Sequence, residues 1–446
     1  MERIVVLGGG ESGCGSAVLA RVKGLDVFLS DAGKIAPKYK TLLEQWNVPY
    51  EEGGHTPEKI LSADRVVKSP GIPDKAPMVK AVREKGIPVI SEIEFAGAYT
   101  DAKTICITGS NGKTTTTTLI YEMLSQAGLN VGLAGNIGES FALAVATRSY
   151  DWYVIELSSF QLDGMYDFRA DIGVLMNITP DHLDRYNYCF QNYIDSKFRI
   201  IQNQRPDDRF IYCADDPVTK ENLGRHPLMM QTLPFGVYTV DGCSATLHDG
   251  MIHAETDGRR LDIAVSELPL LGVHNLYNVM AASLAALSVG VAPESIARTL
   301  RTFRGVEHRL EPCGEINGVL YINDSKATNV DSVFYALGGM TRPVIWIAGG
   351  TDKGNEYDRL YVLAEEKVKA LVCMGLDNAK LVRSFTGRVP RVFDTASLEE
   401  AMRAVAEVAE PGDVVLLSPA CASFDLFKNY EDRGRQFKAA VEALKK

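Results

Sequence analysis

The residues with the clearest potential chemistry form the segment GSNGKT at 109–114, which follows an apolar run and opens a threonine-rich one. Glycines let a backbone curl so that its N–H groups face an anion at the positive end of a helix. The ammonium of Lys113 then suits β- and γ-phosphates, and the Thr114 hydroxyl suits Mg²⁺. Only two residues separate Gly109 from Gly112, where the common phosphate-binding loop has four. The segment predicts a nucleotide-phosphate site, with a plain strand–helix turn as the alternative.

A second glycine pattern lies near the start of the chain, where Gly8-x-Gly10-x-x-Gly13 follows an apolar run. Asp31 ends the next apolar run, 18 residues after Gly13. In dinucleotide-binding folds such glycines bring the backbone close to a pyrophosphate, and the acid binds a ribose hydroxyl. The pattern fits NAD and equally any nucleotide diphosphate. A tight turn without a ligand is the alternative.

Two polar residues, Glu156 and His182, follow successive apolar runs in the middle of the chain. Because the carboxyl ends of parallel strands meet at one edge of a sheet, both are expected near the phosphate-binding segment, where a carboxylate can hold Mg²⁺. The alternative is an ordinary solvated carboxylate and histidine. By residue type alone Lys197, in YIDSKFRI, is a surface lysine.

The last third of the chain has apolar runs that end in polar or small residues, at 319–323, 344–348 and 414–417. His308 and Arg309 precede the first run, where a hinge would let them close over a ligand. Polar loops after buried parallel strands predict a site that faces an anion and a nucleotide, with ordinary strand–helix loops as the alternative. The first run leads into the polar cluster Asp324, Ser325, Lys326, Thr328 and Asn329.

These chemical segments require a framework of strands that alternate with helices, which predicts an α/β fold with parallel sheets. Further strands are expected in the runs 26–31, 63–73, 87–95, 152–160, 172–180 and 370–375, and a helix at 275–290. Domain boundaries are expected near 94–100 and 298–308. The predicted domains are 1–94, 95–298 and 299–446.

Composition narrows the class of protein. The chain has 446 residues, 46% of them hydrophobic and 23% charged, which excludes a disordered or fibrous protein. A net charge of −10 disfavours nucleic acid as a partner. The short apolar run at the N-terminus suits neither a signal peptide nor a membrane helix, so no membrane insertion is expected. The eight scattered cysteines fit reduced thiols in a cytoplasm.

Taken together, the motifs TGSNGKTTT, ELSSFQLD, NITPDHLDR, YIDSKFRI, LLGVHNLYN, GVEHRLE, INDSKATN and GGTDKG resemble the Mur ligases, the ATP-dependent amide-forming enzymes of peptidoglycan precursor synthesis. The resemblance spans nearly the whole chain. It implies a Rossmann-like N-terminal domain that binds the UDP substrate, a central P-loop domain with a parallel sheet that binds ATP, and a C-terminal Rossmann-like α/β domain that binds an amino acid. Within the family, SPGI, INDSKATN and SPACASFDLFKNYEDRG resemble the members that add D-glutamate to UDP-N-acetylmuramoyl-L-alanine through an acyl phosphate.

The resemblance also implies roles for individual residues. The catalytic group is Lys113, Glu156, His182 and Lys197. ATP is expected at Gly109, Asn111, Gly112, Lys113, Thr114, Thr115, Asn275, Asn278, Arg309 and Asp324. The UDP substrate is expected at Gly10, Ser12, Gly13, Asp31, Ser69, Gly71, Asn136, Ser158, Gln161 and His182. D-glutamate is expected at Lys326, Thr328, Lys353, Ser423 and Tyr430. Metal ligands are expected at Thr114, Glu156, His182 and a carbamylated Lys197.

The expected cofactors are therefore ATP and Mg²⁺, with two metal ions, and the expected partners are small-molecule substrates of a cytoplasmic monomer. Rival readings are an NAD-dependent oxidoreductase built on the first glycine pattern and a non-catalytic nucleotide sensor or regulatory ATPase. Within the family, the rivals add a different amino acid, or add glutamates to folate.

Overall fold

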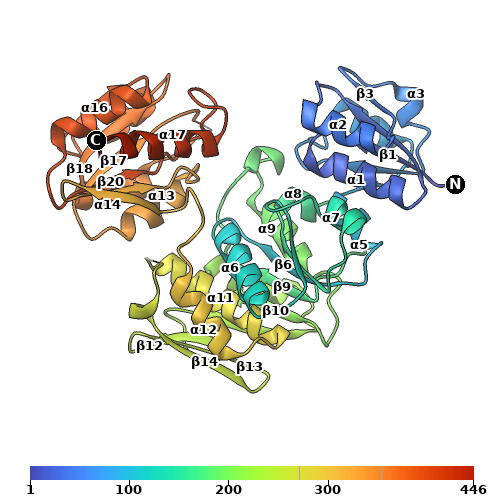
Figure 1. Cartoon of the computed structure of the whole chain (residues 1–446), viewed down its shortest axis with the longest axis horizontal. Coiled ribbons are helices and arrows are strands. Elements are labelled where there is room, and N and C mark those ends of the chain that lie inside the picture. Colours follow the sequence, from blue (N-terminus) through green and yellow to red (C-terminus); the bar gives the residue numbers. More distant parts are fainter. Residues whose placement is uncertain (271, 353, 446) are drawn as a thin grey trace. The chain divides into compact units, whose positions relative to one another are not determined.

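The computed structural model describes residues 1–270, 272–352 and 354–445. The chain forms two compact units, one of Met1–Glu267 with Tyr277–Arg301 and the other of Leu268–Leu276 with Thr302–Lys446. The first unit contains two sheets and the second contains one (Figure 1). The domain limits expected from the sequence stay predictions.

The N-terminal sheet is parallel and has the strand order β3-β2-β1-β4-β5. Its order reverses between β1 and β4, and ligands of such sheets bind beyond the carboxyl ends of the strands at that point. The strands are β1 (Arg3–Leu7), β2 (Asp26–Asp31), β3 (Tyr50–Glu52), β4 (Arg65–Lys68) and β5 (Val89–Ile90). The helices are α1 (Glu11–Val22), α2 (Pro37–Gln45), α3 (Pro57–Ile60), α4 (Pro77–Glu84) and α5 (Glu92–Gly97).

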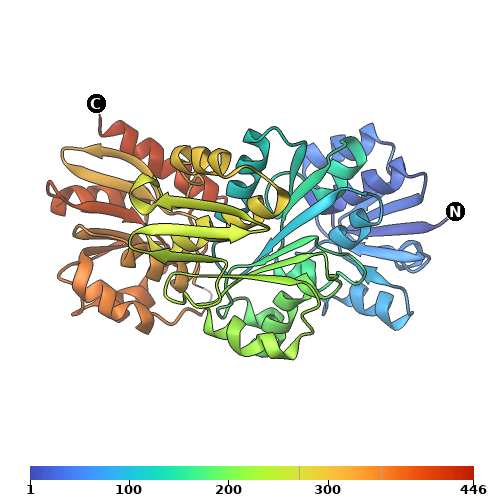
Figure 2. The same ribbon diagram turned by 90° about the horizontal axis from the view of Figure 1, so that it is seen from below.

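The central sheet has the order β14-β13-β12-β11-β10-β9-β6-β8-β7. Its strands run parallel from β7 to β12, and β12 to β14 form an antiparallel extension, drawn in yellow-green in Figure 2. The strands are β6 (Lys103–Thr108), β7 (Val131–Gly135), β8 (Trp152–Glu156), β9 (Ile172–Leu175), β10 (Arg209–Cys213), β11 (Gln231–Gly236), β12 (Ala245–His248), β13 (Met251–Thr256) and β14 (Arg259–Ala264). The helices are α6 (Lys113–Gln126), α7 (Phe141–Thr147), α8 (Ser159–Leu162), α9 (Phe190–Phe198), α10 (Pro217–Asn222), α11 (Val273–Val289) and α12 (Pro293–Thr302), with short 3₁₀ turns η1 (Leu183–Arg185), η2 (Arg199–Ile201), η3 (Leu223–Arg225) and η4 (Val265–Glu267).

The sheet of the second unit has the order β15-β16-β20-β17-β18-β19, with only the edge strand β15 antiparallel. Apolar side chains of α13, α14 and α15 pack around Trp346 on one face, and those of α16 and α17 pack on the other. The strands are β15 (Glu311–Ile316), β16 (Val319–Asn323), β17 (Val344–Ala348), β18 (Val368–Met374), β19 (Val392–Thr395) and β20 (Val414–Leu417). The helices are α13 (Val330–Gly338), α14 (Tyr361–Lys367), α15 (Ala379–Phe385), α16 (Leu398–Val408) and α17 (Tyr430–Ala443), with the 3₁₀ turn η5 (Asp358–Leu360).

The predicted α/β class is confirmed, as are the strand at 26–31, which is β2, and the helix at 275–290, which is α11. The antiparallel extension of the central sheet was not predicted. Within the described part of the chain, no helix combines the length and the apolar character needed to span a membrane.

Helices α1, α5 and α7 join the N-terminal sheet to the central one. Gly15 of α1 lies so close to α7 that a Cβ there would come within 1.9 Å of the Ser140 Oγ. The buried Glu92 of α5 accepts hydrogen bonds from the Ser140 Oγ at 2.5 Å and from the Ala142 N–H at 3.0 Å. The Glu92 carboxyl group thus connects α5 to the first turn of α7.

Burial raises the pKa of Glu92 from 4.5 to about 7. The folded protein therefore binds this proton more tightly than the unfolded chain, so the free energy of unfolding falls as the pH rises through that window, by roughly 3 kcal/mol. We expect Glu92→Gln, whose amide oxygen can still accept both hydrogen bonds, to lose that part of the pH dependence. Urea unfolding of both proteins between pH 4 and pH 8 measures it, and equal slopes would contradict the assignment.

Candidate active site

The segment 109–114, here called the phosphate loop, connects β6 to α6. Gly109 and Gly112 have φ angles of 145° and 86°, which non-glycine residues rarely adopt. A Cβ on Gly112 would also lie 2.6 Å from the Asn278 Oδ1, which accepts a hydrogen bond from Thr116 of α6 at 3.2 Å. Both glycines are thus required by the turn. Asn278, which the sequence predicts to bind ATP, lies beside the loop.

Two lysine side chains converge on the carbonyl oxygen of Gly109. The Lys113 Nζ donates to it at 2.7 Å and to the Ser110 carbonyl at 2.8 Å. The Lys197 Nζ, which reaches the loop from α9, donates to the same Gly109 oxygen at 3.0 Å and to the Thr108 Oγ1 at 3.1 Å. The chain therefore places two nitrogen groups at the end of β6, where the first turn of α6 begins.

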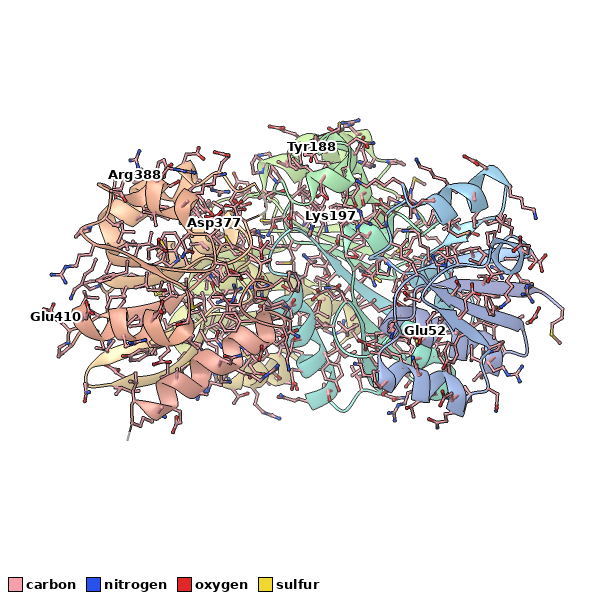
Figure 3. All side chains as sticks on the ribbon, turned by 90° about the horizontal axis from the view of Figure 1, so that it is seen from above. Glu52, Tyr188, Lys197, Asp377, Arg388 and Glu410 are labelled. Carbon is pink, nitrogen blue, oxygen red and sulfur yellow. The ribbon has the colours of Figure 1, made fainter. Side chains whose placement is uncertain are left out.

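Lys197 is only 2% exposed, so its reading as a surface lysine from residue type alone is wrong. Lys197 lies on α9 and is labelled in Figure 3. Burial lowers the pKa of Lys197 well below its ordinary value, and the charge of Lys113 lowers it further, whereas Asp181 and Glu156 act in the opposite direction. These surroundings favour a neutral amine, which is nucleophilic.

Glu156 ends β8 and is 1% exposed. Its Oε1 accepts a hydrogen bond from the Asn136 Nδ2 at 2.8 Å. Its Oε2 is buried and has no hydrogen-bond partner among the described residues. A buried carboxylate oxygen without a donor is costly, and it is the atom type that Mg²⁺ prefers, so Glu156 fits a divalent cation.

His182 follows the segment after β9 and adopts a φ of 52°. Its side chain is 43% exposed, and its ring lies edge-on to that of Phe160, 5.2 Å away. Three residues later, the Arg185 guanidinium packs on the same Phe160 ring and donates to the carbonyl of Pro70, in the loop after β4, at 3.2 Å. The segment that carries His182 is therefore attached to the loop that follows β4.

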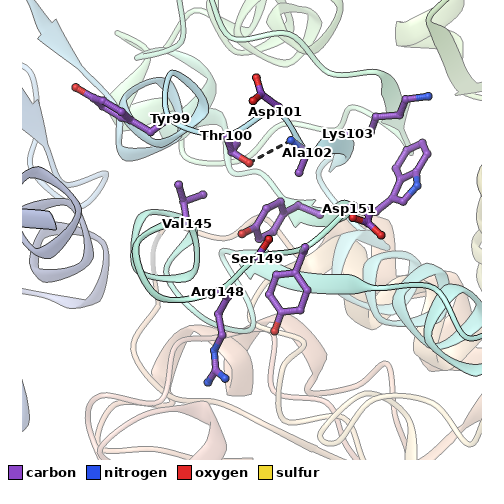
Figure 4. Close-up of a pocket in the computed structure, with 12 residues that line it drawn as sticks. Tyr99, Thr100, Asp101, Ala102, Lys103, Val145, Arg148, Ser149 and Asp151 are labelled. Atoms are coloured by element: carbon purple, nitrogen blue, oxygen red, sulfur yellow. Dashed lines mark hydrogen bonds between the residues drawn. The ribbon is translucent and has the colours of Figure 1, made fainter. Parts of the chain in front are cut away.

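Strand order explains why these groups meet. β6 lies between β8 and β9, so the phosphate loop, Glu156 and the His182 segment all follow the carboxyl ends of adjacent strands. A pocket of about 580 Å³ lies at the opposite, amino edge, lined among others by Lys103, Arg148 and Trp152 (Figure 4). The chemistry-bearing groups lie at the carboxyl edge and not in that pocket.

In the N-terminal domain the glycine pattern forms the turn between β1 and α1. A Cβ on Gly13 would lie 1.8 Å from the Gly8 carbonyl oxygen, so this position requires glycine. The two Asp31 carboxylate oxygens accept from the Gly9 N–H at 2.5 Å and the Gly33 N–H at 2.7 Å. The Asp31 carboxylate thus stabilises the glycine turn by accepting hydrogen bonds from backbone N–H groups of the same domain.

The remaining residues expected to bind the UDP substrate lie on loops and at the first turns of α1 and α8 in the same unit. Ser12 and Ser69 approach each other, with their Oγ atoms 3.5 Å apart, and the space around Gly10 and Gly71 is open. Ser158 and Gln161 instead form a reciprocal capping box at the start of α8.

The second unit contains a buried acidic site after β16. The Asp324 Oδ2 accepts from the Ser418 Oγ at 2.8 Å, and its Oδ1 accepts from the Leu310 N–H at 3.2 Å. Burial raises the pKa of Asp324 to about 7. The positive charges of Arg309, next to Leu310, and of Arg433 oppose this rise.

The residues expected to bind D-glutamate lie around the same sheet edge. The Lys326 Nζ lies 5.5 Å from the centre of the Tyr430 ring, and Ser423 is buried after β20. Thr328 follows in the loop before α13. Asn275, which was expected to bind ATP, is buried near the start of α11. Lys353 lies outside the described residues.

Sequence reasoning did not single out Arg433 of α17, which is 1% exposed. Its guanidinium donates to carbonyl oxygens of Ser325, Gly349 and Cys421, on the loops after β16, β17 and β20. Burial lowers its pKa to about 10. Nothing in the sequence NYEDRGRQF distinguishes Arg433 from a solvent-exposed arginine. The burial of its charge could therefore not be predicted from the sequence.

The parallel sheets and the phosphate loop at a strand-order reversal define an α/β protein of the phosphate-binding-loop class. Three family descriptions match the chain: "Mur ligase MurD-like, N-terminal domain" over residues 2–91, "Mur ligase middle domain" over 107–286, and "Mur ligase, glutamate ligase domain" over 308–421. The chain belongs to the Mur ligase family, which confirms the resemblance seen in its motifs.

Full-length relatives carry the name UDP-N-acetylmuramoylalanine–D-glutamate ligase. The Bacteroides fragilis protein is 56% identical over 445 residues, covering 100% of both chains. The Porphyromonas gingivalis protein is 52% identical and covers 98% of both. The Chlorobaculum tepidum protein is 41% identical and covers 98% of this chain and 97% of its own.

Solved structures share the fold at low identity. UDP-N-acetylmuramate-alanine ligase MurC from Thermotoga maritima aligns with a TM-score of 0.63 at 18% identity, covering 99% of both chains. A pseudomurein peptide ligase type C from Methanothermus fervidus aligns with a TM-score of 0.62 at 20% identity, covering 99% of this chain and 100% of its own.

Proposed function

We propose that this protein joins D-glutamate to UDP-N-acetylmuramoyl-L-alanine with conversion of ATP to ADP and phosphate, in peptidoglycan precursor synthesis. The observation that carries the proposal is the phosphate loop at the carboxyl edge of the central sheet, with Lys113, Glu156 and Lys197 around it. The names of the full-length relatives support the choice of both substrates.

A carboxylate is a poor electrophile, which is why ATP is needed. An oxygen of the L-alanyl carboxylate attacks the γ-phosphorus, the bond from that phosphorus to the ADP oxygen breaks, and an acyl phosphate forms. The amine of D-glutamate then adds to the acyl carbon, the tetrahedral intermediate expels phosphate with its bonding electron pair, and the amine proton goes to solvent. The product is an amide.

The protein must first offset repulsion between anions. Two unit charges about 4 Å apart interact by roughly 4 kcal/mol at an effective dielectric of 20. In this proposal the backbone N–H groups at the start of α6, from Gly112 to Thr115, cradle the β- and γ-phosphates. Lys113, which lies on the loop carbonyls at 2.7 and 2.8 Å, turns its ammonium to the γ-phosphate.

Glu156 and Thr114 are the proposed holders of Mg²⁺, and the Glu156 Oε2, which has no hydrogen-bond partner in the part of the chain that the structure describes, supports that choice. When bound, Mg²⁺ neutralises phosphate oxygens and aligns them for in-line transfer. We assign to Lys197 a carbamate: its neutral amine adds to CO₂, an N–C bond forms, and a proton leaves to solvent. The depressed pKa of the buried amine supports this reaction, which replaces a cation by a second metal-binding carboxylate.

His182 is proposed to position the metal ions and the acyl phosphate rather than to act as the base for the amine. The UDP substrate is assigned to the N-terminal loops around Gly10 and Ser69 and to Asn136, which follows β7 of the central sheet. D-glutamate is assigned to the loops around Lys326 and Ser423. A second metal ion, a monomeric state and a cytoplasmic location stay predictions.

Phosphate release with candidate amino acids tests the function. With ATP, Mg²⁺ and UDP-N-acetylmuramoyl-L-alanine present, we expect D-glutamate to stimulate release of one phosphate per amide formed, and L-glutamate, L-lysine and meso-diaminopimelate to have no such effect. Stimulation by a different amino acid, or release that no acceptor changes, would contradict the proposal.

A further inference from the structure

Asn177, two residues beyond β9, contacts the phosphate loop more extensively than its neighbours in sequence. Its Oδ1 accepts from the Asn111 N–H at 2.9 Å, and its Nδ2 donates to the carbonyl oxygen of the same Asn111 at 3.1 Å. Its own carbonyl accepts from the Ser110 N–H at 2.9 Å. Asn177 therefore provides hydrogen-bond partners for the N–H and the C=O of Asn111 and for the N–H of Ser110.

The contact is specific to this carboxamide. An amide side chain offers an acceptor and a donor side by side, which matches the N–H and C=O of one backbone residue, and among the common side chains only Asn and Gln do so. The approach also depends on Gly109, because a Cβ there would lie 2.9 Å from the Met176 Cβ and 3.2 Å from both the Asn177 N and O. Glycine at position 109 is thus required both by its positive φ and by the close approach of Met176 and Asn177.

The segment around Asn177 is itself anchored from both sides. The Ser110 Oγ donates to the Thr179 carbonyl at 2.9 Å, and the Thr179 N–H donates back to that Oγ at 2.9 Å. The Ile178 N–H donates to the Oδ2 of the buried Asp216, the N-cap residue of α10, at 3.2 Å. Asn177 consequently lies in a segment that is hydrogen-bonded both to the phosphate loop and to the N-cap residue of α10.

This arrangement has a consequence for the ligand. The N–H groups of Ser110 and Asn111 are directed to Asn177, so the anion-binding donors are left to the next residues, at the start of α6. If the peptide of Asn111 rotated, the N–H groups at the start of α6 would no longer face the triphosphate. A misplacement of the reacting phosphate by about 1 Å is enough to slow its transfer strongly.

We propose that Asn177 is a positioning residue for ATP: its carboxamide holds the peptide of Asn111 in the orientation that presents the first turn of α6 to the triphosphate. The inference rests on the proposed function, because it concerns the loop that function uses. Asn177 acts through the loop and is not itself a phosphate ligand.

The test compares two asparagines of the central domain. Asn203, half-buried like Asn177, also makes two side-chain hydrogen bonds to backbone, to the Tyr166 and Phe168 carbonyls, and serves as the control. The variants are Asn177→Ala, Asn177→Asp, Asn203→Ala and Asn203→Asp in the full chain. Calorimetry with a non-hydrolysable ATP analogue and Mg²⁺ gives the dissociation constant, and thermal unfolding gives the midpoint.

We expect Asn177→Ala to weaken analogue binding roughly tenfold, the equivalent of about 1.4 kcal/mol. Asn177→Asp should weaken it further, since its second oxygen would face the Asn111 carbonyl oxygen at the present donor position. The Asn203 variants should lower the unfolding midpoint by a similar amount but leave the dissociation constant within about twofold. Binding within twofold of wild type for both Asn177 variants would overturn the positioning role alone, whereas a wild-type protein that does not bind the analogue would overturn the proposed function.

Discussion

Lys113→Ala is expected to abolish ATP-dependent amide formation while the fold stays intact. The Lys113 ammonium lies on the Gly109 and Ser110 carbonyls at the start of α6, so it is the positive charge of the phosphate loop itself. Removal of one preorganised donor from a developing charge typically reduces the rate by about 10²–10³. Coupled phosphate release under saturating substrates measures the loss, and we expect residual turnover below a few per cent.

Lys103→Ala is the matched control for this variant. Lys103 is the first residue of β6, the strand that leads into the phosphate loop. Its ammonium lies 5.4 Å from the centre of the Trp152 ring, at the amino edge of the sheet. Its loss removes the same charge from the same strand without touching the loop. Turnover of Lys113→Ala above a few per cent, or an equal loss in Lys103→Ala, would count against the assignment.

Lys197→Ala is expected to lose most activity and to regain part of it with added formate or acetate. In the proposed function this lysine carries a carbamate, so a short carboxylate that enters the space left by the side chain replaces the missing anion. Burial lowers the pKa of Lys197, which favours the neutral amine that can add CO₂. The activity of the variant is measured against carboxylate concentration.

The loss alone would not identify the carbamate, because Lys197 also donates to the Gly109 carbonyl and the Thr108 hydroxyl. A role limited to these hydrogen bonds predicts that carboxylates have no effect, since an anion cannot donate to either oxygen. Lys197→Arg supplies a cation that forms no carbamate, and we expect it to be as inactive as Lys197→Ala. Failure of carboxylates to restore any activity would contradict the carbamate.

The phosphate loop was predictable from sequence because its constraints are local. Gly109 and Gly112 need positive φ angles, and the strand before and the helix after them have clear apolar patterns. The position of Glu156 beside the loop was predictable for a topological reason, since parallel strands bring their carboxyl ends to one edge.

Other features depend on tertiary contacts that leave no local pattern. Burial of Lys197 and Arg433 follows from the elements that pack over them, and a lysine or arginine in an amphipathic helix looks the same in sequence whether covered or solvated. The antiparallel strands β13 and β14, by contrast, do alternate buried and more exposed residues, a local pattern that the sequence analysis did not use. Asp31 was expected at a ribose, and its hydrogen bonds to Gly9 and Gly33 come from the turn geometry.

Transfer of an oxygen isotope tests the central claim most directly, namely that the ATP held at the phosphate loop gives its γ-phosphoryl group to a carboxylate oxygen. UDP-N-acetylmuramoyl-L-alanine labelled with ¹⁸O in the alanyl carboxylate is turned over with ATP and D-glutamate, and the released phosphate is examined by ³¹P NMR. If the acyl phosphate forms, each phosphate carries one ¹⁸O atom from the carboxylate. Phosphate that contains no label, with amide still formed, would contradict the account.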